Sequence, residues 1–268
     1  MNEILEAIIL GIVQGLTEFL PVSSDGHLEL AKWILGNQDS ASDSFLMTVI
    51  LHFGTAFAIV WVFRKSIIQI FKNLFKPEGK KFVLLILISM IPAVIVGLGF
   101  ESQMTALFSQ KIVLVGVFLI INGIVLVTSD YLPNTYKPIT PVKALIMGIA
   151  QAIAILPGIS RSGSTITTSV ALGIDRNEAA HFSFLMVVPL IFGKIAKDLM
   201  DGTINESNTN ALPLLIGFIV AFLVGVVACK WMIAIVKKAK LGYFGFYCIL
   251  IGLVAIILRI WVWPNGPN

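Results

Sequence analysis

A small set of polar side chains stands inside otherwise apolar sequence, and their types suit phosphate chemistry. They gather around two polar stretches, PVSSDGH at 21–27 and PGISRSGST at 157–165. Gln14 and Glu18 are four residues apart, so on a helix they share one face. With Asp25 they offer the hard oxygen ligands that a divalent cation prefers. Such a cation would bridge phosphate oxygens, which predicts a metal-assisted phosphate site.

The second polar stretch supplies a positive charge for the phosphate. The guanidinium of Arg161 is planar and permanently charged, and its fork matches phosphate oxygens. His27, three residues after Ser24, is placed to act as a base or an acid. A helix is expected to start after each stretch, where free N–H groups and a positive dipole end bind anions. The candidate N-caps of these helices are Ser24 or Asp25, and Ser160, Ser162 or Ser164.

These residues also have structural interpretations. Ser and Gly in membrane helices commonly permit close packing, which would account for Ser162, Gly163 and Ser164. Arg161 and Glu18 could form an ion pair with no chemical role. His52 lies within an apolar run and is interpreted as hydrogen-bonded structure rather than as a ligand.

The composition places this chemistry in a membrane. Of 268 residues, 57% are hydrophobic and 13% are charged, where soluble domains carry about 25% charge. The mean hydropathy of +0.93 excludes a soluble enzyme, a disordered chain and a nucleic-acid binder. Cys229 and Cys248 both lie in apolar runs, so no disulfide framework is implied. The acidic start lacks a cleavage pattern and is interpreted as part of the mature protein.

The elements that must position these residues are apolar helices. Stretches of about 20 residues can span a bilayer, and they lie at 44–63, 82–100, 112–129, 182–199, 212–229 and 242–261. Two further apolar regions, 3–36 and 142–173, are each interrupted by a polar stretch. We predict an all-α polytopic membrane protein with six transmembrane helices plus two re-entrant helix–loop–helix segments. An eight-span arrangement is the alternative.

The charges of the connections predict the topology. Basic residues concentrate in 64–81 and 230–240, whereas the connection after 197 is acidic. The positive-inside rule then puts 64–81 and 230–240 in the cytoplasm and the acidic connection outside. With six spans, the connection 130–143 also falls inside, and the segment 101–111 and both termini fall outside.

The two halves of the chain resemble each other. The matching segments are GIVQGLTEFLPVSS at 11–24 with GIAQAIAILPGIS at 148–160, and FLMTVILHFG at 45–54 with FLMVVPLIFG at 184–193. We therefore predict a single integral membrane domain over 1–268, with a first repeat over 1–130 and a second over 140–268. Because each repeat has three spans, the halves would insert in opposite orientations, as in transporters. Their broken loops would meet near mid-membrane, where irregular backbone lines a functional cavity.

The two polar stretches carry a family resemblance. QGLTEFLPVSSDGH at 14–27 and PGISRSGST at 157–165 resemble the two signatures of the bacterial undecaprenyl pyrophosphate phosphatases of the bacitracin-resistance type. The resemblance implies hydrolysis of undecaprenyl pyrophosphate to undecaprenyl phosphate, which recycles the lipid carrier of cell-wall synthesis and confers bacitracin resistance. It also implies a divalent cation, Mg or Ca, and an outward-facing site in the bacterial inner membrane. The expected partners are the polyprenyl pyrophosphate and membrane lipids, with a homodimer left open and no nucleic acid.

The resemblance and the residue-based candidates together give an expected site. Its catalytic residues are Glu18, Ser24, His27 and Arg161. Its substrate-binding residues are Ser23, Ser160, Arg161, Ser162 and Thr165, and its metal ligands are Gln14, Glu18 and Asp25. Asp25 departs from the family pattern, which has Thr or Ser there.

Two mechanisms and a competing function class are left open. Either Ser24, deprotonated by His27 or Glu18, attacks the phosphate, or a metal-activated water attacks and Ser24 only positions it. Both rely on positioning and charge stabilisation. A transporter or lipid flippase without chemistry is the competing class, because a fold does not settle function.

Overall fold

The computed structural model describes residues 2–35, 41–100, 111–133, 135–200, 210–236 and 240–262, and in these ranges its regular structure is helical, without a strand. The helices are α1 (Glu3–Thr17), α2 (Ser24–Leu35), α3 (Ala41–Val62), α4 (Arg64–Lys72), α5 (Pro77–Gly99), α7 (Ile112–Ser129), α8 (Pro141–Ile153), α9 (Arg161–Ala171), α10 (Arg176–Met200), α11 (Ala211–Val236), α12 (Gly242–Ile257) and the π-helix η1 (Leu258–Val262). The all-α prediction is confirmed.

The long helices match the predicted spans. Within the described residues, α5, α7, α10, α11 and α12 are long and apolar enough to cross a membrane. The first predicted span corresponds to α3, which meets the same test together with α4 across a bend of 68°. Large apolar side chains such as Leu87, Ile95 and Leu250 are exposed along these helices, and a lipid environment would cover them. The chain is therefore an integral membrane protein.

The two interrupted regions form helix pairs. In the first region α1 packs against α2, and in the second α8 packs against α9. The second pair departs from the prediction in detail, because α9 begins at Arg161, within the polar stretch and not after it. Its N-cap is Ser160, one of the three predicted candidates. The oxygen of Ser160 therefore caps the helix one residue before Arg161, which places the guanidinium at the positive end of α9.

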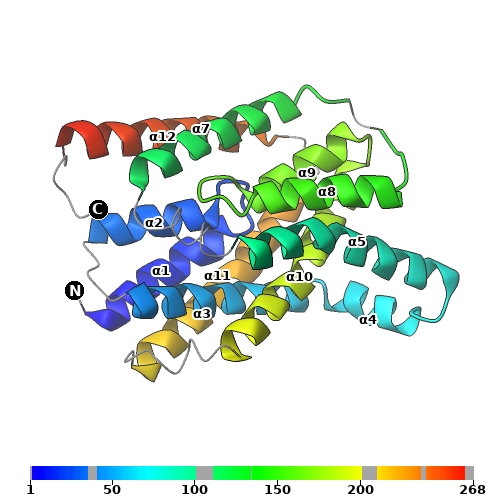
Figure 1. Cartoon of the computed structure of the whole chain (residues 1–268), viewed down its shortest axis with the longest axis horizontal. Coiled ribbons are helices and arrows are strands. Elements are labelled where there is room, and N and C mark those ends of the chain that lie inside the picture. Colours follow the sequence, from blue (N-terminus) through cyan, green and yellow to red (C-terminus); the bar gives the residue numbers. More distant parts are fainter. Residues whose placement is uncertain are drawn as a thin grey trace.

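The long helices pack side by side around the short pairs (Figure 1). The helix α11 packs along both α1 and α3, α8 packs along α5, and α12 packs along α7. A central apolar core holds the end of α1 in place. Phe19 is fully buried and contacts Phe184 of α10, with ring centroids 6.0 Å apart. Because Phe19 follows Glu18, this packing also fixes the position of the carboxylate.

Tertiary contacts gather the predicted cytoplasmic connections at one end of the bundle. Asp130 accepts hydrogen bonds from the backbone at the start of α12, and Arg176 of α10 donates to the carbonyl of Ser129. Phe63, just before α4, contacts His181 with ring centroids 5.5 Å apart. The starts of α1 and α11 lie toward the opposite end (Figure 1). Parts of the predicted topology lie outside the described residues, namely 101–110, Asp201, Glu206, Lys237 and Lys238.

Candidate active site

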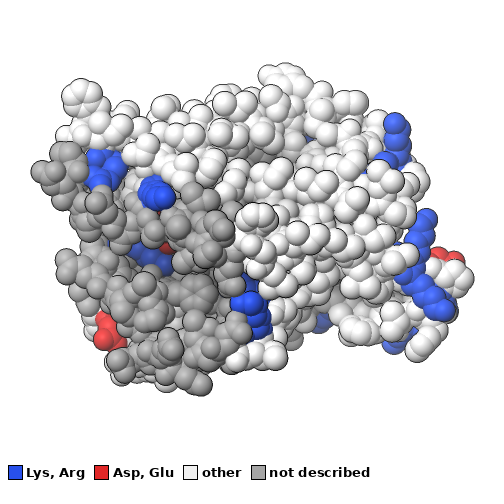
Figure 2. Space-filling model, viewed as in Figure 1, with Lys and Arg blue, Asp and Glu red and all other residues white. Residues whose placement is uncertain are grey.

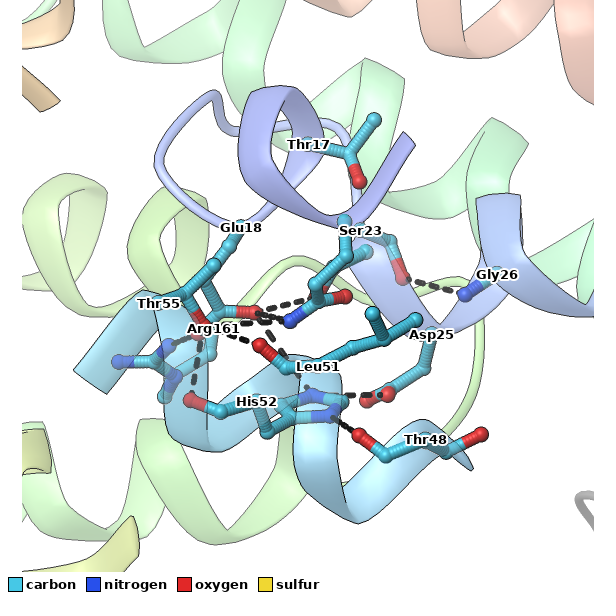
Figure 3. A network of polar contacts seen from close by, with 12 residues as sticks. Thr17, Glu18, Ser23, Asp25, Gly26, Thr48, Leu51, His52, Thr55 and Arg161 are labelled. Atoms are coloured by element: carbon cyan, nitrogen blue, oxygen red, sulfur yellow. Dashed lines mark hydrogen bonds and ion pairs between the residues drawn. The ribbon is translucent and has the colours of Figure 1, made fainter. Parts of the chain in front are cut away.

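Glu18 is the centre of a polar network that joins α1, α2, α3 and α9 (Figure 3). Its side chain is only 3% exposed. Its Oε2 accepts the hydroxyl proton of Ser24 at 2.6 Å and an amide proton of Gln14 at 3.2 Å. Its Oε1 accepts from Nη2 of Arg161. Burying a carboxylate costs free energy unless the group is paired and hydrogen-bonded. These three donors offset that cost for Glu18.

Gln14 lies on the same face of α1 as Glu18, as the four-residue spacing predicts. The side chain is fully buried, and its amide nitrogen also lies 3.4 Å from the hydroxyl of Thr55 on α3. Its Oε1 is buried without a hydrogen-bond partner among the described residues. An orphaned buried oxygen calls for a donor or a cation.

Ser23 joins the two polar stretches. Its Oγ accepts from the backbone N–H of Gly158 at 3.0 Å and from that of Gly26 at 3.3 Å. Ser23 has a φ of 69° and Gly158 a φ of 101°, a left-handed conformation that favours glycine. The second contact makes Ser23 the cap of α2, so the prediction of Ser24 or Asp25 as the N-cap is wrong. The hydroxyl of Ser24 is thereby left to contact Glu18.

Asn122 of α7 connects the same two stretches from a third helix. Its Oδ1 accepts from the backbone N–H of Ser160 at 3.1 Å, and its Nδ2 donates to the carbonyl of Pro21 at 3.0 Å. Sequence reasoning missed this residue. The available signal was a lone polar side chain within an apolar span, which is costly and therefore usually functional or structural.

The hydroxyl groups of the second stretch hold the local fold. Ser160 accepts from the backbone N–H of Gly163 at 3.1 Å and lies 3.2 Å from the hydroxyl of Ser162. Thr165 donates to the carbonyl of Arg161 at 2.8 Å. All three hydroxyl side chains are buried. The structure thus brings Arg161 to Glu18, and it places the three predicted phosphate-binding hydroxyl residues at the N-terminal end of α9, next to Arg161.

Both ring nitrogens of His27 contact groups other than the hydroxyl of Ser24. Its Nδ1 lies 2.8 Å from the carbonyl of Ser23 and therefore carries the proton, since a carbonyl only accepts. Its Nε2 lies 3.0 Å from the hydroxyl of Tyr247 on α12, and the two rings stack with centroids 5.6 Å apart. A ring with its proton on Nδ1 can accept a hydrogen bond from Tyr247 at Nε2. In this arrangement Glu18, not His27, contacts Ser24.

His52 of α3 completes the network and was not expected there. Its Nε2 lies 3.3 Å from Oδ1 of Asp25 and 3.8 Å from Oε2 of Glu18. Its Nδ1 lies 2.9 Å from the carbonyl of Thr48, so this nitrogen carries a proton. Nε2 of the same ring therefore faces two carboxylates, whose oxygens accept hydrogen bonds. Asp25 therefore has a partner on α3.

The described side chains include donors for a divalent cation without forming a complete site. No three His, Cys, Asp or Glu side chains within the described ranges are grouped as a metal centre. The chemistry of the donors nevertheless fits, because the oxygens of Gln14, Glu18 and Asp25 are the hard ligands such a cation takes. The partnerless Oε1 of Gln14 is the observation that favours it.

The fold and the site define a polytopic helical membrane protein in which a buried carboxylate at the end of α1 contacts a serine at the start of α2 and an arginine at the start of α9. The chain belongs to the family of the bacitracin resistance protein BacA, whose sequence profile matches residues 7–254. The predicted resemblance is thereby confirmed.

Several similar proteins share one name, undecaprenyl-diphosphatase. The protein from Christiangramia forsetii is 57% identical over 258 residues, which cover 95% of this chain and 98% of that one. The Bacteroides fragilis protein is 44% identical over 260 residues, covering 94% of this chain and 97% of its own. That of Methanobrevibacter smithii is 38% identical over 276 residues, covering 95% and 97%. The similarity thus extends over nearly the whole chain.

Proposed function

We propose that this protein is a phosphatase that hydrolyses undecaprenyl pyrophosphate to undecaprenyl phosphate and inorganic phosphate. The observation that carries the proposal is the 2.6 Å hydrogen bond from Ser24 to Glu18, with Arg161 on the other oxygen of the same carboxylate. A nucleophile, a base and a phosphate-binding cation thus lie in one cluster. The name of the relatives supports the substrate. Recycling of the lipid carrier and resistance to bacitracin would follow from this reaction.

Catalysis is proposed to begin with proton transfer from Ser24 to Glu18. The Ser24 oxygen then attacks the terminal phosphorus, and the bond to the bridging oxygen breaks to release undecaprenyl phosphate. Water hydrolyses the phosphoserine, releases inorganic phosphate and regenerates the hydroxyl. Glu18 is within hydrogen-bond reach of this proton, which is the first requirement of a general base. In the alternative route water attacks directly and Ser24 only positions the phosphate.

Arg161 is proposed to bind the terminal phosphate. Within the described part of the chain only its Nη2 has a partner, Glu18. Nε and Nη1 therefore remain for phosphate oxygens, and a guanidinium can hold two of them at once. The N-terminus of α9 lies at the same place and favours an anion through its free N–H groups.

A divalent cation, magnesium or calcium, is proposed to be held by Gln14 and Glu18, with Asp25 as a third ligand. When bound, it would neutralise charge on the pyrophosphate. Arg161 already contacts Glu18, so the guanidinium shares that task.

The inverted repeat is proposed as the architecture, with six transmembrane helices and two re-entrant pairs. Helices at corresponding positions of the two repeats make corresponding contacts. The helix α1 of the first repeat packs along α11 of the second, and α8 of the second repeat packs along α5 of the first. Matched glycines support the same relation. A Cβ at Gly11 would meet the carbonyl of Gly217, and one at Gly148 would meet that of Ser89. We also propose that the protein lies in the inner membrane with its active site facing outward, and that it forms a homodimer.

Purified protein in detergent is expected to release inorganic phosphate from undecaprenyl pyrophosphate. EDTA should stop the release, and added magnesium or calcium should restore it, because the clustered phosphate oxygens need a compensating charge. A colorimetric phosphate assay with and without EDTA measures this. No phosphate release with the cation present would overturn the proposal and favour a carrier of lipid phosphates.

The serine route predicts a phosphorylated intermediate. Rapid quenching with substrate labelled in its terminal phosphate should yield labelled protein within one turnover, and Ser24→Ala should abolish the label. Ser66→Ala on α4 is the matched control, because it removes a hydroxyl outside the Glu18 network and should leave the label in place. If the wild type turns over without ever carrying label, water is the nucleophile.

A further inference from the structure

The short helix α4 carries an unusual surface for the end of a membrane span. It follows α3 with a bend of 68°, so it runs across the end of the bundle instead of continuing the span. No residue of α4 is buried. The helix is therefore attached to the protein along one side only.

Three side-chain stripes run along this helix and the turn that follows it. Ile67 and Ile70 are half-buried and pack against the central core. Ile68 and Phe71, with Phe75 in the turn, are exposed apolar side chains, and Phe75 is 86% exposed. At 100° per residue, Ile68 and Phe71 lie next to the packed stripe.

Lysines form the third stripe, on the other side of the exposed apolar one. Lys65 and Lys72 are seven residues apart and share one face, and Lys76 follows in the turn. The segment 64–81 holds six basic residues against one acid, Glu78. Among the described residues none of these three lysines has a carboxylate partner, and Figure 2 shows basic side chains gathered at this end of the molecule.

We propose that α4 and its turn bind the anionic phospholipid surface at this end of the protein. Ile68, Phe71 and Phe75 would enter the acyl boundary, and the lysines would contact phosphodiester headgroups. An exposed apolar stripe beside a basic stripe is the pattern of a helix lying in the membrane interface. Trp61 supports a position of α4 at the level of the lipid headgroups, because aromatic rings favour that region. Its side chain is exposed, and its ring lies 4.8 Å from the guanidinium of Arg64.

The test measures which lipid lies beside α4. Gln69→Cys places a single reactive thiol on the exposed basic side, because Cys229 and Cys248 are both fully buried. The full-length protein carries a bimane label there and is reconstituted in mixed phosphatidylglycerol and phosphatidylcholine vesicles. In parallel samples one lipid or the other is brominated, and quenching of the label reports its local enrichment.

The brominated anionic lipid should quench the label more strongly than the brominated zwitterionic lipid. Each lysine that contacts a headgroup should enrich the anionic lipid beside α4 by up to about fivefold, and salt screening lowers this value. The variant Lys65→Gln/Lys72→Gln/Lys76→Gln should bring the ratio close to one. The control Lys111→Gln/Lys137→Gln/Lys143→Gln removes the same charge elsewhere and should leave the ratio unchanged.

Three results would overturn the proposal. Equal quenching by both lipids in the wild type would exclude an anionic preference, and an unchanged ratio in the α4 variant would exclude these lysines. No quenching by either lipid would place α4 outside the bilayer and favour a protein partner. Phosphate release by each variant is measured alongside and should stay at the wild-type rate, so this outcome is independent of the proposed function.

Discussion

Glu18→Gln is expected to lower phosphate release by about a thousandfold, within the range for loss of a general base. The amide keeps the shape of the carboxylate but cannot accept the proton of Ser24. It also removes the charge that Arg161 and His52 face. The rate of phosphate release at saturating substrate measures the effect, and thermal unfolding in detergent shows whether the variant is folded.

The matched control is Glu178→Gln, an exposed carboxylate in the first turn of α10, which should release phosphate at the wild-type rate. His52→Gln tests the neighbour of the carboxylate and should cost less than Glu18→Gln, since His52 does not contact Ser24. A folded Glu18→Gln protein with more than a tenth of the wild-type rate would remove Glu18 from the role of base.

Arg161→Lys is expected to reduce the rate by about a hundredfold or more, as for the loss of one transition-state hydrogen-bond donor. A lysine keeps the positive charge, but one ammonium cannot hold Glu18 and also bind two phosphate oxygens as a guanidinium fork does. Steady-state kinetics measure the loss, which should fall mainly on kcat if Arg161 stabilises the transferred phosphoryl group.

Arg161→Ala with added guanidinium separates chemistry from structure. Partial recovery of the rate by the free cation would support direct phosphate binding. Arg64→Lys, at the distant start of α4, is the control: the same change of side chain away from the site should leave the rate of phosphate release unchanged. Near-normal turnover of Arg161→Lys would leave Arg161 only its structural ion pair with Glu18, the interpretation that the sequence also allowed.

Local patterns were sufficient for the helices and for part of the site. Apolar runs of about twenty residues predict spans because a bilayer core must be crossed by such a length. The spacing of Gln14 and Glu18 predicts a shared face because helix geometry alone fixes it. Each polar stretch predicts a break because it contains Pro and several residues that cap helices.

The assignment of individual polar side chains depended on packing between distant segments. Ser23 and Ser24 have the same side chain in sequence, but the left-handed backbone of Ser23 turns its oxygen toward Gly158 and leaves Ser24 to Glu18. Neither contact follows from a local propensity. The backbone conformation between α1 and α2 is set by the loop that packs against it.

The two histidines His27 and His52 also show which features the sequence predicts and which depend on packing. A helical membrane protein with two polar stretches, and the candidates Glu18, Ser24 and Arg161, could be predicted from the sequence, because polar residues are conspicuous in apolar surroundings. The contacts of His52 with Asp25 and Glu18, and the stacking of His27 on Tyr247, could not be predicted and are seen only in the folded chain. These contacts depend on how α3 and α12 pack against the polar stretches, because the rotation of each helix about its axis sets which side chain reaches the site.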